Sequence, residues 1–143
     1  MNLCVVELTT TPADEHLNRQ GIALRVELSY DKAGCRDGCY WRRSTHAMEW
    51  MEHATPPAVH FGTPEPLRQE FALSLWNAIS TARISPFTEG QFGYIHPMTF
   101  QLKVSSPAFS CDLSWKDELP PEWSALKQAV QVLESIADDG ASG

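Results

Sequence analysis

Residues 99–116 read TFQLKVSSPAFSCDLSWK, and the alternation in this stretch decides the fold class. In two runs separated by a Ser/Pro turn, every second residue is apolar: Phe100, Leu102, Val104, Phe109, Cys111, Leu113 and Trp115. Successive side chains of a strand point to opposite faces, so each run would have one apolar and one polar face. The pattern predicts an antiparallel hairpin with a polar outer face.

Two amphipathic helices are expected on either side of this hairpin in the sequence. Residues 65–82 carry apolar side chains at spacings of three and four, which predicts a helix with one apolar face. Thr63 is a possible N-cap for this helix. The prolines near its start are tolerated, because the amide groups of a first helical turn have no partner within the helix. The same spacing follows Pro121, at Trp123, Leu126, Val130, Leu133 and Ile136 or Ala137. Trp76, Trp115 and Trp123 are expected in the core, where large aromatic side chains anchor packing.

The first part of the chain adds further strands. Residues 4–8 form a short apolar run, and residues 22–30 alternate strictly between apolar and polar. Residues 40–43 are read as a strand, followed by a helical turn from Ser44. We therefore expect an α+β fold, an antiparallel sheet of four to five strands with two amphipathic helices packed on one face. Residues 1–137 would form a single domain, and residues 138–143 a flexible tail.

Composition and charge narrow the classes of partner. The chain has 143 residues, enough for one domain, with 11 Lys and Arg against 18 Asp and Glu, a net charge of −7. Excess negative charge disfavours binding to nucleic acid and to anionic membranes, and is compatible with a protein partner that has a basic surface. No signal peptide or membrane-spanning run is expected, so the predicted compartment is the cytoplasm, with free thiols.

One cluster of residues has the types that bind zinc. Cys35 and Cys39 are separated by three residues, and His46 and His53 follow. Two thiolates and two imidazoles could coordinate zinc tetrahedrally. The spacing of seven residues between His46 and His53 is wider than the spacing of histidines in the usual zinc-finger motif. A thiol nucleophile is a related possibility, since Cys39 lies close to basic residues. The alternative is that both cysteines merely flank a turn. We expect no metal and no cofactor, and keep a zinc- or thiol-dependent enzyme or a zinc-binding module as the second hypothesis.

The segment from Tyr40 to Trp50 is the best candidate for recognition. It contains Tyr40, Trp41, Arg42, Arg43 and Trp50, and these residue types dominate the hot spots of protein interfaces. The alternative is that Trp41 packs across the sheet while the arginines face water. The sequence contains no Gly-x-Ser-x-Gly elbow and no glycine-rich phosphate loop. No catalytic residue is therefore predicted.

Residues 67–136 resemble small bacterial proteins that combine a helix, a hairpin and a closing helix begun by proline, including the emfourin-like protease inhibitors. The resemblance rests on the alternation and on Leu-Pro-Pro-Glu-Trp at 119–123, and it carries over no functional residue. Together these observations predict a small, acidic, cytoplasmic and non-enzymatic protein. It would act by binding another protein, as an immunity, inhibitor or assembly-subunit protein does.

Overall fold

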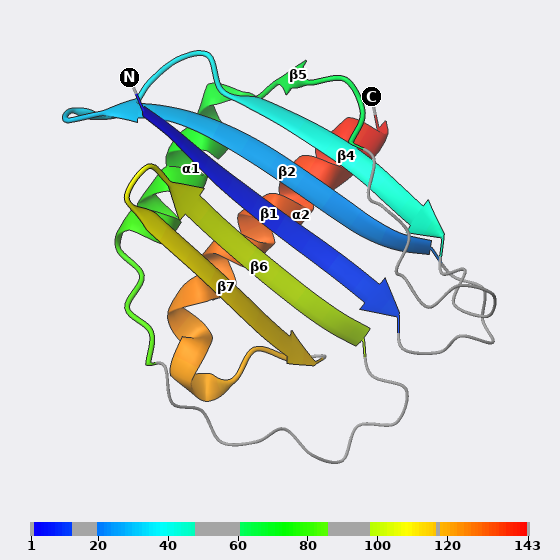
Figure 1. Cartoon of the computed structure of the whole chain (residues 1–143). Coiled ribbons are helices and arrows are strands. Elements are labelled where there is room, and N and C mark those ends of the chain that lie inside the picture. Colours follow the sequence, from blue (N-terminus) through cyan, green and yellow to red (C-terminus); the bar gives the residue numbers. More distant parts are fainter. Residues whose placement is uncertain (1, 13–19, 48–60, 86–97, 117, 143) are drawn as a thin grey trace.

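A computed structural model of the chain describes residues 2–12, 20–47, 61–85, 98–116 and 118–142 (Figure 1). Its elements are, in order, β1 (Asn2–Pro12), β2 (Gln20–Asp31), β3 (Gly34–Cys35), β4 (Tyr40–Ala47), β5 (Glu65–Pro66), α1 (Gln69–Ser80), β6 (Met98–Ser106), β7 (Phe109–Lys116), the 3-10 helix η2 (Pro121–Leu126) and α2 (Lys127–Ser142). None of the described helices is long and apolar enough to cross a membrane.

The strands form one antiparallel sheet in the order β5-β4-β2-β1-β6-β7, and β3 pairs with the end of β2. The predicted α+β class and antiparallel sheet are confirmed. The sheet has seven strands rather than four to five. Two of them, β3 and β5, are only two residues long, too short for any alternation of apolar residues to reveal them.

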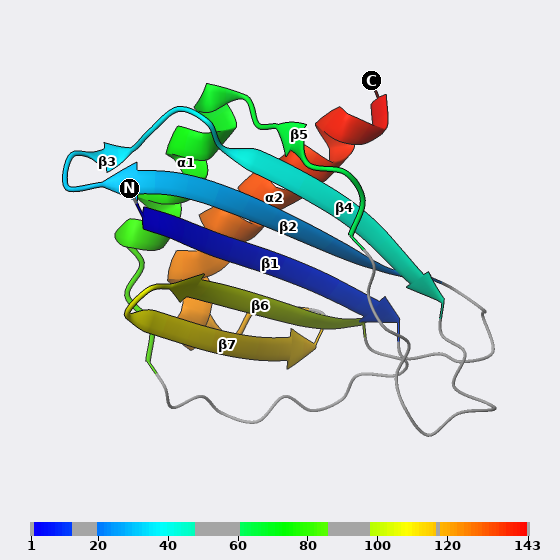
Figure 2. The ribbon, with the colours of Figure 1, turned by 45° about the horizontal axis from the view of Figure 1, so that its top comes forward.

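Both helices lie on the same side of the sheet in the two views (Figures 1 and 2). The apolar sides of the strands meet there, and the cross-strand register aligns Val6 of β1 with Val26 of β2 and Val104 of β6. Trp115 and Trp123 are buried as expected, whereas Trp76 is half-buried and lies against Tyr30 with ring centroids 4.9 Å apart. The largest fully buried side chains are Val6, Val26, Leu28, Leu75, Leu102, Leu133 and Ile136.

Helix α1 begins later than its apolar pattern suggested. Glu65–Pro66 is a strand paired with β4, and the helix starts at Gln69 after Arg68, which has extended backbone angles. A residue that precedes proline is disfavoured in the helical region, so Thr63 and Glu65 keep the chain extended. The predicted helix start and the Thr63 N-cap are therefore wrong.

Two other boundaries differ from expectation. Strand β4 continues to Ala47 because it pairs with β2 from Glu27↔Tyr40 to Gln20↔Ala47, so no helical turn begins at Ser44. Helix α2 continues through Ser142, beyond Ile136 and Ala137, where its apolar spacing ended; a flexible tail over residues 138–143 stays a prediction. That the chain is a single domain stays a prediction.

Candidate protein-binding surface

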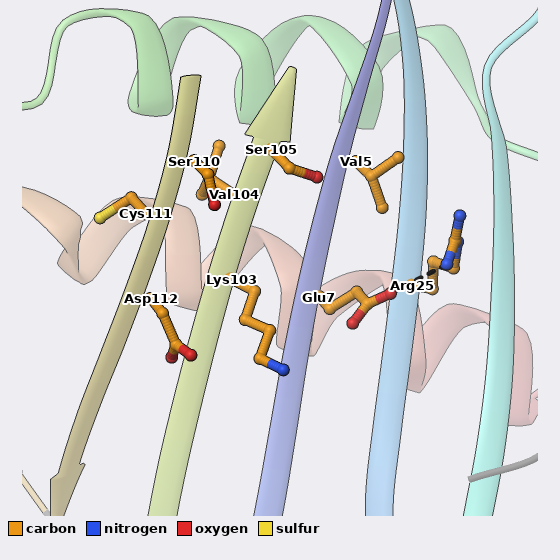
Figure 3. Close-up of a pocket in the computed structure, with 9 residues that line it drawn as sticks. All are labelled: Val5, Glu7, Arg25, Lys103, Val104, Ser105, Ser110, Cys111 and Asp112. Carbon is orange, nitrogen blue, oxygen red and sulfur yellow. Dashed lines mark hydrogen bonds and ion pairs between the residues drawn. The ribbon is translucent and has the colours of Figure 1, made fainter. Parts of the chain in front are cut away.

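The face of the sheet turned away from the helices carries the residues that alternate with the buried ones along β1, β2, β6 and β7, most of which are polar. We call this surface the open face. In Figure 3 its side chains project from the strands while both helices lie behind them. Antiparallel sheets commonly keep one face in water, and here no described helix covers it. The open face is therefore a sheet surface that the described helices leave uncovered.

A row of charged residues crosses the open face from β4 to β7. The register places Arg42 opposite Arg25, Arg25 opposite Glu7, Glu7 opposite Lys103 and Lys103 opposite Asp112. Side chains directly opposite on neighbouring strands lie within interaction distance. We call these five residues the charged row.

Ion pairs order the first half of the charged row. Arg25 donates from Nη1 to Glu7 Oε1 at 3.0 Å and from Nε to Glu27 Oε1 at 3.2 Å. The same Glu27 oxygen lies 3.6 Å from Arg42 Nε, a buried atom with no hydrogen-bond partner among the described residues. The guanidinium carbon of Arg25 lies 5.9 Å from the ring centroid of Phe61, within cation–π range. These contacts hold two arginines in place before any partner arrives.

The second half of the charged row borders a hollow. Its volume is about 340 Å³, and small side chains such as Val5, Ser105 and Ser110 leave the space open beside Glu7 and Lys103 (Figure 3). Lys103 is exposed and makes no ion pair within the described part of the chain, whereas the carboxylate of Asp112 accepts hydrogen bonds from Gln101 Nε2. The hollow thus offers one uncommitted ammonium group.

Exposed apolar side chains lie on the same face. Leu3 is 45% exposed and Tyr40 is 42% exposed. Tyr40 lies opposite Glu27 and Leu3 lies opposite Ser29, so both belong to the open face. Apolar anchors beside fixed charges are typical of protein interfaces.

The predicted recognition segment is divided between the two faces. Tyr40 and Arg42 lie on the open face, whereas Trp41 and Arg43 lie opposite the buried residues Val26 and Leu24 and share their face. Trp41 is half-buried and packs against the core, and whether the segment binds a partner stays a prediction. Trp50 lies outside the described residues. Strand alternation alone could have indicated this split, but the prediction treated the segment as a unit.

The other members of the charged row were missed. The predicted site residues did not include Glu7, Arg25, Lys103 or Asp112. Only the register of four strand pairs brings them into line.

The structure brings the two cysteines of the second hypothesis together but not His46. Cys35 Sγ and Cys39 Sγ lie 3.8 Å apart. His46 follows Cys39 along the extended chain at about 3.3 Å per residue, so its backbone lies roughly 20 Å away. His53 is outside the described residues, and within the described ones no three His, Cys, Asp or Glu residues could jointly hold a metal ion.

Burial and the neighbouring Cys39 thiol raise the pKa of Cys35 to about 12. A free cysteine has a pKa near 8.5, so the reactive thiolate of Cys35 is scarce at neutral pH. We expect alkylation of Cys35 to be roughly 50-fold slower in the folded chain than in urea, after allowing for the greater nucleophilicity of a more basic thiolate. The folded rate should rise tenfold per pH unit up to about pH 10. Iodoacetamide labelling followed by mass spectrometry checks this, and a plateau below pH 9 would contradict it.

Comparison with known proteins adds no relative: no protein-family model, no curated protein and no solved structure matches the chain. The resemblance of residues 67–136 to emfourin-like inhibitors therefore stays an expectation.

Proposed function

We propose that this chain is a non-enzymatic protein that binds another protein through the open face of its sheet. The observation that supports this most is the charged row, which crosses five strands beside exposed apolar side chains on a face that no described helix covers. Immunity proteins, inhibitors and assembly subunits all work by such binding. On this proposal the chain acts in the cytoplasm.

The physical argument is preorganisation. Glu7 and Glu27 hold Arg25 at fixed distances, so less side-chain freedom is lost when a partner binds. Tyr40 and Arg42 add the two residue types that most often supply binding energy. Because the row contains both signs of charge, it would select a partner by the order of charges rather than by net charge. The overall net charge of −7 favours encounter with a partner that has a basic surface.

The test compares two double variants of the tagged chain in lysate from the cell that makes it. Tyr40→Ala/Arg42→Ala alters the open face, and Leu73→Ala/Arg68→Ala makes the same kinds of change at exposed positions on and beside α1. We expect the first to weaken binding of the captured partner by about 100-fold, since two hot-spot residues together contribute about 3 kcal/mol. The second should bind within about threefold of wild type.

The readout is affinity for the partner that wild type recovers, measured with the purified pair by calorimetry. Circular dichroism confirms that each variant is folded. Equal affinity of both variants, or a loss confined to the helix-side variant, would overturn the proposal.

A further inference from the structure

Cys35 and Cys39 have features of a redox-active pair that the proposed function does not use. Their sulfur atoms lie 3.8 Å apart, and both approach the same acceptor, the carbonyl oxygen of Arg36, at 3.8 Å from Cys35 Sγ and 3.2 Å from Cys39 Sγ. A disulfide needs sulfur atoms about 2.05 Å apart, so the pair must approach by roughly 1.8 Å. Side-chain rotation can supply a movement of this size.

The turn between the cysteines is held at both ends. The Arg36 amide donates to Ser29 O at 2.7 Å, and Arg36 Nε donates to Asp31 Oδ2 at 2.6 Å. The Leu67 amide donates to Cys39 O at 2.9 Å. Gly38 has a φ of +84°, a conformation that favours glycine, and the chain resumes its antiparallel pairing with β2 at Tyr40. The backbone therefore keeps the two sulfurs in contact.

The other two thiols have no comparable partner among the described contacts. Cys4 is buried in β1, and Cys111 is half-buried in β7, three strands away from β2, with which β3 pairs. Cys4 lies close enough to Cys35 to contribute to its raised pKa, so it is the one competitor for a disulfide with Cys35.

We propose that Cys35 and Cys39 form a reversible intramolecular disulfide, produced by exchange with a small disulfide such as glutathione disulfide. Cys35 is half-buried and Cys39 is only 3% exposed, so Cys35 reacts first. Its thiolate attacks one sulfur of glutathione disulfide, forms a mixed disulfide and releases one glutathione thiolate. Cys39 then loses its proton and attacks the Cys35 sulfur, which releases the second glutathione.

The two steps balance. The protein dithiol is oxidised by two electrons, glutathione disulfide is reduced to two glutathione molecules, and the two thiol protons pass to the departing thiolates through solvent. Because burial disfavours the thiolate of Cys35, exchange is slow at neutral pH and accelerates as pH rises. The pair would respond to a sustained change in redox conditions rather than to a brief pulse of oxidant.

The sequence makes the product easy to identify. Trypsin cleaves after Lys32, Arg36 and Arg42, so Cys35 and Cys39 fall in separate peptides, residues 33–36 and 37–42. Cys4 and Cys111 fall in two further peptides. A disulfide between Cys35 and Cys39 therefore joins two short peptides that reduction separates.

The experiment equilibrates the folded full-length protein in glutathione redox buffers, quenches with acid, alkylates the remaining thiols and digests with trypsin. In wild type we expect two of the four thiols to be lost and the 33–36 and 37–42 peptides to be linked. Cys39→Ser should stop at a glutathione adduct on Cys35. Cys35→Ser should leave Cys39 reduced, and Cys111→Ser should behave as wild type.

Three outcomes would overturn the proposal. They are a link between Cys4 and Cys35, a glutathione adduct on Cys35 that persists in wild type, and four free thiols in a buffer that oxidises dithiothreitol. Circular dichroism of the oxidised protein verifies that the disulfide forms in the folded chain. None of these readouts depends on a binding partner, so this proposal stands or fails separately from the proposed function.

Discussion

Leu75→Ala is expected to lower the free energy of unfolding by about 3 kcal/mol, because it leaves a cavity beneath a helix that covers the sheet. Leu75 is 0% exposed and lies with Ala72 and Ala78 on the buried side of α1. The loss has two parts. One is the hydrophobic free energy of burying the several carbon atoms that the substitution removes, and the other is the van der Waals contacts that the surrounding side chains no longer make. For a chain of this length the melting temperature should fall by about 10 °C, measured by calorimetry.

Leu73→Ala provides the matched control. Leu73 lies two residues away on the same helix but is 43% exposed, so the same substitution removes little buried surface. We expect the free energy of unfolding to fall by less than about 1 kcal/mol. The small amount of buried surface that is removed lowers stability, and the better helix propensity of alanine offsets part of that loss. Equal losses in the two variants would mean that α1 does not pack through the side predicted by its spacing.

Apolar periodicity predicted those parts of the fold that bury one regular face. The hairpin read from residues 99–116 is present as β6 and β7, and the strand read from residues 22–30 is the centre of β2. Each of these strands places apolar residues at every second position, and that spacing is a property of the residues themselves. Leu75 and Leu133 were identified in the same way, from helical spacing, and both are fully buried.

Strand β4 could not be predicted well because backbone pairing defines it. Its face beside Val26 and Leu24 carries the half-buried Trp41 and the exposed Arg43, so neither face is purely apolar. On its outer edge, Gly62 donates to Arg43 O at 3.2 Å and Glu65–Pro66 pairs with the start of the strand. These partners lie about 20 residues further along the chain, and no local pattern reveals them.

The charged row was beyond sequence reasoning for a related reason. It joins Glu7 to residues as distant as Asp112, and its alignment depends on the register of four strand pairs. A slip of one residue in any pair would turn that strand's charged residue toward the core. The alternation predicted that each residue lies on a polar face, but not which residues become neighbours.

Glu27→Gln is expected to lower the free energy of unfolding by about 2 kcal/mol at low salt. Arg25 and Arg42 are directly opposite on neighbouring strands, an arrangement that like charges disfavour. The Glu27 carboxylate contacts both, at 3.2 and 3.6 Å, and its side chain is only 16% exposed. Glutamine keeps the shape but removes the charge that offsets two cations. Urea unfolding measures the loss, which should shrink in about 1 M NaCl, where the Debye length is about 3 Å.

Two further variants separate this explanation from a general effect of removing a carboxylate. Glu70→Gln changes a side chain that is 60% exposed and paired with Arg68, so we expect a loss below about 1 kcal/mol. Adding Arg42→Gln to Glu27→Gln should restore part of the lost stability, because it removes one of the two facing cations. If the losses from Glu27→Gln and Arg42→Gln simply add instead, Glu27 and Arg42 do not interact, and their ion pair does not stabilise the fold.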